Sequence, residues 1–109
     1  MKLVIQIPCY NEENTLEETV GGIPEYLPGI DNLEIIIIDD GSTDNTVQTA
    51  ERIARVTDVV RLPVHRGLAA AFMAGIHRSL ARGADVIVNT DADNQYRGED
   101  IAKLVKLGI

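Results

Sequence analysis

The stretch that decides the fold is EIIIIDDGSTDN, residues 34–45. Its four consecutive isoleucines, Ile35 to Ile38, show no polar alternation. Such a run indicates a strand that is buried on both faces, as in a parallel sheet covered by helices. The run ends at Asp39 and Asp40, and a polar turn that can begin a helix follows. We therefore expect a strand, a turn and a helix that belong to an α/β domain.

The same alternation of strand and helix patterns continues on both sides of this segment. Strands are predicted over residues 3–7, 34–38, 59–62 and 85–89, and helices from Glu12, after residues 42–45, over 68–79 and over 99–107. Pro8 is expected to stop the first strand, Asn11 to cap the first helix and Pro28-Gly29 to end it. Right-handed crossovers between such units predict a Rossmann-like, mainly parallel sheet of about four strands with helices on both faces.

Length and composition narrow the class of protein. A chain of 109 residues is one domain, residues 1–109, and it stops shortly after the last predicted helix, which suggests truncation at the C-terminus. Aromatic residues make up only 4%, so the core must be aliphatic. The net charge of −7 argues against nucleic acid as a partner, because phosphates are neutralised by basic surfaces.

Cysteine and hydropathy patterns point to the cytoplasm. Cys9 is the only cysteine, so no disulfide can form within the chain. The apolar runs are too short and too interrupted for a signal peptide or a transmembrane segment. An open sheet edge would favour the pairing of two chains into a homo-oligomer.

Polar residues follow each of the predicted strands. These segments are Pro8–Glu12, Asp39–Ser42, His65–Gly67 and Asp91–Gln95. Because open parallel sheets bind ligands beyond the carboxyl ends of their strands, the clustering predicts a binding site at that edge.

The segment Asp91-Ala92-Asp93 is the strongest candidate for a metal site. Two carboxylates two residues apart can reach one Mg²⁺ or Mn²⁺ ion, and Gln95 offers a further oxygen. The ion would in turn bind a diphosphate, which explains how an acidic protein can hold an anion. The alternative interpretation is a solvated acidic loop that caps the last helix.

Two further segments have open interpretations. Gly41 and Ser42 predict a turn and a helix cap, while Asp39 or Asp40 can also accept hydrogen bonds from a base or a ribose hydroxyl. Tyr10 either stacks on a base or packs on the first helix.

The loop His65-Arg66-Gly67 places a cation near a helix start. Arg66 either contacts a phosphate or pairs with the acidic residues nearby. Cys9 as a nucleophile would need His65 as its base, whereas a small space-filling role is the simpler interpretation.

Two other enzyme classes do not fit the motifs. A dinucleotide-dependent oxidoreductase requires a glycine-rich turn after the first strand, and residues 8–13 contain no glycine. A phosphoaspartyl enzyme would need a Lys or Arg and a Ser or Thr near its aspartate, and Asn94-Gln95 supplies neither.

Four motifs together resemble the family 2 glycosyltransferases. They are IPCYNEENTLEETV (7–20), IIIIDDGSTDNT (35–46), RGLAAAFMAGI (66–76) and VIVNTDADNQY (86–96). Within that family the chain is most similar to the dolichol- or polyprenyl-phosphate sugar synthases, over about residues 3–105. Members often have Asn-x-Gly where this chain has His65-Arg66-Gly67.

The resemblance implies a GT-A fold, of which this chain is the nucleotide-binding half, and a role for each site residue. Pro8, Tyr10 and Glu12 would border the nucleotide, and Asp40 would hydrogen-bond the base with Asp39 supporting it. Asp91 and Ala92 would lie by the ribose or sugar. Asp93 and Gln95, with Asp91, would hold Mg²⁺ or Mn²⁺ on the diphosphate.

The resemblance also implies inverting transfer from a UDP- or GDP-sugar to a polyprenyl phosphate or another glycan or lipid acceptor. A hydroxyl acceptor would need a general base, expected in a later segment that this chain lacks, so its catalytic residues are unknown. A polyprenyl phosphate would need none, and would bring the protein to the cytoplasmic face of a membrane. The alternative is a catalytically incomplete module that binds nucleotide and metal.

Overall fold

The alternation predicted from residues 34–45 extends through the computed structural model, which describes residues 1–90. Its elements are β1 (Lys2–Cys9), α1 (Leu16–Gly21), β2 (Asn32–Asp39), α2 (Thr46–Arg52), β3 (Val56–Arg61), α3 (Leu68–Ala81) and β4 (Val86–Asn89). The helix predicted over residues 99–107 lies outside the described residues.

The strands form one parallel sheet, as predicted. Within residues 1–90 the strand order is β3-β2-β1-β4, and each neighbouring pair is parallel. The chain moves outward from β1 to β3 and then returns to the other side of β1 to form β4. The strand order therefore reverses between β1 and β4, which is where doubly wound sheets bind ligands.

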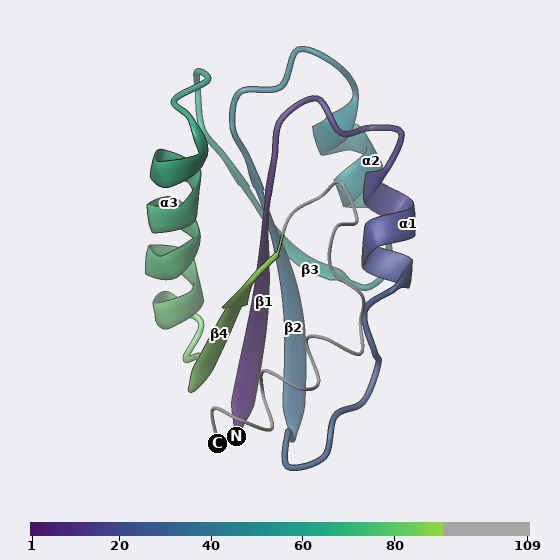
Figure 1. Cartoon of the computed structure of the whole chain (residues 1–109), viewed down its shortest axis with the longest axis vertical. Helices are drawn as coiled ribbons and strands as arrows, with labels where there is room; N and C mark the ends of the chain where they lie inside the picture. Colours follow the sequence, from purple (N-terminus) through teal and green to yellow (C-terminus); the bar gives the residue numbers. More distant parts are fainter. Residues whose placement is uncertain (91–109) are drawn as a thin grey trace.

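The isoleucine run of β2 is buried on both faces because helices cover both sides of the sheet. Figure 1 shows α3 on one side and α1 with α2 on the other. Ile35 and Ile37 belong to the core that includes α1 and α2, whereas Ile36 and Ile38 pack with Ala71 of α3. This arrangement confirms the predicted fold class.

β1 continues through Pro8, where the sequence predicted its end. The carbonyls of Lys2 and Gln6 accept hydrogen bonds from the β4 side, and that of Cys9 accepts one from Asp40 after β2. Even-numbered residues of β1 thus direct their backbone polar groups toward β4. Pro8 is even-numbered, so its missing N–H is on the β4 side and removes no bond to β2. It also lies beyond the last β1–β4 pair.

The first helix is shorter than predicted. α1 begins at Leu16 rather than near Glu12, and it ends at Gly21, well before Pro28. Asn11 does not cap it, because Asn11 adopts a left-handed conformation with φ of 52° and its side chain is engaged elsewhere. Glycines at 21 and 22 end the helix because they lose the most conformational entropy in one.

α3 spans 14 residues and sits close to the sheet, as its small residues predicted. Its buried positions are Ala71, Gly75 and Ser79. Leu68 and Phe72, which the periodicity also placed on the buried face, are 64% and 38% exposed. The buried stripe is narrower than the apolar one because only small side chains fit where the helix approaches β1. None of the helices within residues 1–90 has the length and hydrophobicity to cross a bilayer.

Candidate functional site

The loops that follow β1, β2 and β3 gather at one end of the sheet (Figure 1). They carry three of the four polar segments singled out in the sequence. The parallel arrangement places them together because all carboxyl ends share one edge. We refer to residues 8–12, 39–46 and 65–67 as the polar rim.

Asn11 joins the first two loops of the polar rim. Its Oδ1 accepts hydrogen bonds from the backbone N–H groups of Thr43 (2.8 Å) and Asp44 (3.3 Å). Its own N–H donates to Ser42 Oγ at 2.9 Å. The Ser42 hydroxyl, which was predicted to cap α2, is therefore engaged with Asn11. The left-handed backbone that permits this is one that asparagine tolerates better than most residues. Sequence reasoning missed this role, although an asparagine two residues after the end of β1 was a usable signal.

Asp44 fixes the start of α2 in place of Ser42. Its carboxylate accepts hydrogen bonds from the backbone N–H of Thr46 (2.9 Å), from the Thr46 hydroxyl, and from the N–H of Glu13 (3.4 Å). Burial opposes ionisation, but these hydrogen bonds outweigh it, and the pKa of Asp44 lies below its ordinary value. Asp44 is therefore a charged clamp between α2 and the β1–α1 loop.

Asp40 holds the third loop of the polar rim. The residue is 3% exposed, and its two carboxylate oxygens accept hydrogen bonds from the backbone N–H groups of Arg66 and Gly67, each at 2.8 Å. His65 Nδ1 lies 2.9 Å from Oδ2. Each carboxylate oxygen has two lone pairs, so Asp40 retains acceptor capacity for a ligand.

Gly41 allows the β3–α3 loop to lie directly against the end of β2. A Cβ at this position would lie 2.4 Å from His65 N and 2.5 Å from the Val64 carbonyl carbon. The φ of +74° is a second reason for glycine here. The turn predicted at Gly41 is confirmed.

Tyr10 and His65 form an aromatic pair at the surface of the rim. Their ring centroids lie 3.9 Å apart with an interplanar angle of 32°. Tyr10 is 40% exposed, so it packs on the loop residue His65 while keeping ring surface open to solvent. An exposed ring beside hydrogen-bond acceptors is the kind of surface on which a nucleobase stacks.

Asp39 has one oxygen without a hydrogen-bond partner. Oδ2 accepts the N–H of Ser42 at 3.1 Å, whereas the buried Oδ1 finds no partner among residues 1–90. The residue is 3% exposed. Buried polar atoms normally have a hydrogen-bond partner, and an unpaired one calls for an explanation, such as a role in binding a ligand.

The thiol of Cys9 is unsuited to nucleophilic catalysis. Burial raises its pKa, with a further contribution from the negative charge of Glu12. The thiol donates to the carbonyl oxygen of Ile7 at 3.4 Å. A thiol that stays protonated is a weak nucleophile, so the space-filling interpretation holds.

Glu12 and Arg66 both take part in holding the backbone. Glu12 Oε2 accepts a hydrogen bond from the Thr15 hydroxyl (2.9 Å) at the start of α1, and its N–H donates to Thr46 Oγ1 (2.9 Å). Arg66 contributes its backbone N–H to Asp40, and its side chain forms no ion pair with any of residues 1–90.

Asp91, Ala92, Asp93 and Gln95 lie outside the described residues. Residues 1–90 contain no group of three or more His, Cys, Asp or Glu side chains that could hold a metal ion. The metal site therefore stays a prediction from the sequence.

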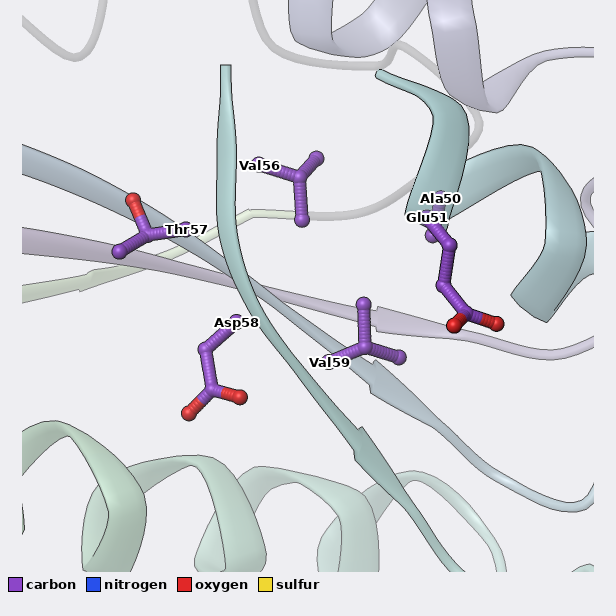
Figure 2. A pocket seen from close by; sticks show the side chains of 6 residues that line it. All are labelled: Ala50, Glu51, Val56, Thr57, Asp58 and Val59. Atoms are coloured by element: carbon purple, nitrogen blue, oxygen red, sulfur yellow. The ribbon is translucent and has the colours of Figure 1, made fainter. Parts of the chain in front are cut away.

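A pocket of about 380 Å³ lies away from the polar rim, beside the edge strand β3. Figure 2 shows that its lining comes from α2 and β3: Ala50, Glu51, Val56, Thr57, Asp58 and Val59. It contains none of the site residues predicted from the sequence. Arg78 of α3 pairs with Asp58, so that carboxylate is already engaged.

Comparison with known proteins gives a family match over almost the whole chain. The model of the family described as "Glycosyl transferase family 2" matches residues 4–107. A polyprenol monophosphomannose synthase from Mycolicibacterium smegmatis is 36% identical over 109 residues, which cover 95% of this chain and 40% of that protein. The chain thus spans less than half the length of this curated relative.

Two solved structures are similar in fold. A mannosyltransferase from Pyrobaculum calidifontis in complex with GDP-Man and Mn²⁺ has a TM-score of 0.72 at 24% identity, over 95% of this chain and 31% of that one. A glucosyl-3-phosphoglycerate synthase from Mycobacterium tuberculosis in complex with Mn²⁺, UDP and glucosyl-3-phosphoglycerate has a TM-score of 0.62 at 31% identity. That match covers 84% of this chain and 33% of the synthase. The neighbours are GT-A glycosyltransferases, as the sequence motifs predicted.

Proposed function

Because the chain belongs to glycosyl transferase family 2, we propose that it binds the nucleotide part of a UDP- or GDP-sugar at the polar rim, for transfer of the sugar to a polyprenyl phosphate. The observation that carries the proposal is the convergence of three strand-end loops, tied together through Asn11 and Asp40. A rim so cross-linked is preorganised, which lowers the cost of ligand binding.

Each described residue has a part in this proposal. Tyr10 presents its exposed ring to the base, and Asp40 accepts a base N–H with its remaining lone pairs. Asp39, with one buried oxygen that no atom of residues 1–90 pairs, supports Asp40 and is the second acceptor at the same place. Pro8, near the end of β1, and Glu12 border the nucleotide because they lie on either side of Tyr10 in the sequence.

The assignment of a divalent ion rests on the sequence motif of residues 91–95. Asp93 and Gln95, with Asp91, would hold Mg²⁺ or Mn²⁺, and Ala92 would line the ribose or sugar. The metal would supply positive charge for the diphosphate, which an acidic protein otherwise repels. The Mn²⁺ and UDP in the 31% identical synthase structure support this assignment.

The transfer would invert the anomeric carbon. The phosphate oxygen of the acceptor attacks from the face opposite the nucleotide, the bond to the donor phosphate breaks, and the nucleoside diphosphate leaves. An anionic phosphate acceptor needs no general base. The name of the polyprenol relative supports this acceptor class.

A thermal-shift panel tests the binding step directly. UDP-, GDP- and dTDP-sugars are added with and without Mn²⁺, because a ligand that binds the native state must raise the unfolding midpoint. We expect a metal-dependent rise with at least one donor, lost in Asp93→Ala. Glu51→Ala, which removes an exposed carboxylate from the pocket beside β3, is the matched control and should retain the rise. Absence of any metal-dependent rise would refute the proposal.

The second candidate is a module that binds nucleotide and metal without turnover. The observation in its favour is that the polar rim offers hydrogen-bond acceptors to a nucleotide, whereas its buried, protonated Cys9 thiol is no nucleophile. A transfer assay separates the two: release of UDP or GDP in step with glycolipid formation supports the enzyme, and binding without release supports the module.

A further inference from the structure

We infer that Gln6 is a positioning residue that holds the carboxyl end of β4 and Thr90, which directly precede the predicted metal segment in the sequence. The inference rests on the proposed function, since it concerns how that site is held. Gln6 lies in the middle of the sheet, on β1, and its exposure is 0%. A buried amide is costly unless its polar atoms are all paired, so its place in the core needs an explanation.

The carboxamide of Gln6 is fully engaged. Its Nε2 donates to the carbonyl of Phe72 on α3 (3.1 Å) and to Asn89 Oδ1 on β4 (3.0 Å). Its Oε1 accepts from the Ser79 hydroxyl at 3.2 Å. Three elements therefore meet at one side chain, and each bond fixes its orientation further.

Gly75 keeps this carboxamide in place. A Cβ at Gly75 would lie 2.7 to 2.8 Å from the three terminal atoms of Gln6. The glycine thus forms the space into which the carboxamide fits, and α3 can approach β1 closely there. The fit leaves the Gln6 side chain little freedom to move away from Asn89.

Gln6 contacts two successive residues of the β4 end. Its side chain binds Asn89, and its backbone carbonyl accepts the N–H of Thr90 at 3.1 Å. Gln6 and Asn89 are also the last pair in the β1–β4 register. Asp91 follows immediately in the sequence.

This position matters because β4 is short and lies where the strand order reverses. It has four residues, and within residues 1–90 it pairs only with β1. A strand end held by so few bonds frays readily. Gln6 adds a side-chain bond at Asn89, two residues before Asp91 in the sequence, so losing it would loosen the chain directly before the predicted metal ligands rather than only weaken the core.

The test compares Gln6→Met and Asn89→Ala with the control Ser79→Ala. Ser79→Ala removes a different bond of the same carboxamide, so it lowers stability while leaving the link to β4 intact. We measure amide hydrogen exchange at Thr90 relative to Asp85, whose N–H binds the Lys2 carbonyl at the other end of the β1–β4 pair. We expect the ratio to rise about tenfold in the first two variants and to stay within about twofold in the control.

Binding of UDP and GDP with Mn²⁺, measured by calorimetry, gives the second readout. Gln6→Met and Asn89→Ala should each raise Kd about tenfold, and the double variant should be no worse than either, because both remove one link. An unchanged exchange ratio, or faster exchange with an unchanged Kd, would overturn the inference. If the parent chain binds neither nucleotide, the proposed function fails instead, and the exchange ratio still decides whether Gln6 holds β4. Should Gln6→Met not fold, Asn89→Ala, at an exposed position, decides alone.

Discussion

The two adjacent aspartates at the carboxyl end of β2, Asp39 and Asp40, should respond differently to the same substitution. Asp40 and Asp39 are equally buried, at 3% exposure. Asp40 binds the N–H groups of Arg66 and Gly67, one through each oxygen, whereas Asp39 binds one N–H and its Oδ1 has no partner within residues 1–90. Replacement by asparagine keeps the shape and removes the charge, so it isolates what the charge contributes.

Asp40→Asn should be clearly destabilising. The amide places an N–H₂ group against one of the two backbone donors, which removes a charge-assisted hydrogen bond of about 1.5–3 kcal/mol. The other bond becomes neutral, which costs about a further 1 kcal/mol. The sum is a loss of about 2.5–4 kcal/mol in the free energy of unfolding. With an m-value of about 2 kcal/mol/M, the urea midpoint should fall by about 1–2 M.

Asp39→Asn should leave the midpoint unchanged or raise it. Here the substitution removes a buried charge with an unpaired oxygen, and a neutral amide costs less to bury than a carboxylate. Urea unfolding followed by far-ultraviolet circular dichroism measures both variants against the parent. Equal losses, or a larger loss for Asp39→Asn, would show that hydrogen bonding does not determine the stability of this rim.

Three further predictions concern packing, reactivity and pH. Gly75→Ala should destabilise the protein by about 1–3 kcal/mol in urea unfolding, because its Cβ would displace the hydrogen-bonded carboxamide of Gln6. Gly21→Ala, whose Cβ would have no atom within 4 Å, should instead stabilise the protein by up to about 1 kcal/mol. Cys9 should react with iodoacetamide only when urea unfolds the protein, since its raised pKa keeps the thiol protonated; equal rates with and without urea would contradict this. The pKa of Asp44 is lowered in the folded state, so its stabilisation is complete above the unfolded value of about 3.9 and is lost as pH falls through the folded one. Midpoints of the parent and Asp44→Asn should therefore differ at neutral pH and converge in acid.

The elements with the strongest patterns were the most predictable. The isoleucine run of β2 and the small-residue helix α3 are at the predicted places, because burial on two faces and close helix packing each restrict residue choice. Pro8 misled the prediction of β1, since proline ends a strand only where its missing N–H faces a partner. The periodicity likewise misplaced Leu68 and Phe72 on the buried face. Their exposure depends on how closely α3 approaches the sheet, which the sequence pattern does not give.

The candidate site was predictable in position but not in its internal connections. Polar residues after parallel strands had to converge on one edge, so the sequence was enough to bring Tyr10, Asp40 and His65 together. Which atoms they use was not predictable. Asn11 was expected to cap α1 and instead joins two loops, because its partners lie more than 30 residues away in the sequence.

By itself, the sequence determined the parallel α/β fold, the edge of the sheet that carries the site, and membership of a glycosyltransferase family. Hydrophobic periodicity and short motifs are local properties, and local properties can be read along a chain. Only the tertiary structure decided that Asp40 holds the β3–α3 loop, that Gln6 joins β1 to the end of β4, and that one oxygen of Asp39 finds no partner in the described part of the chain. Such contacts depend on distances between atoms that are far apart in sequence, and packing alone sets those distances.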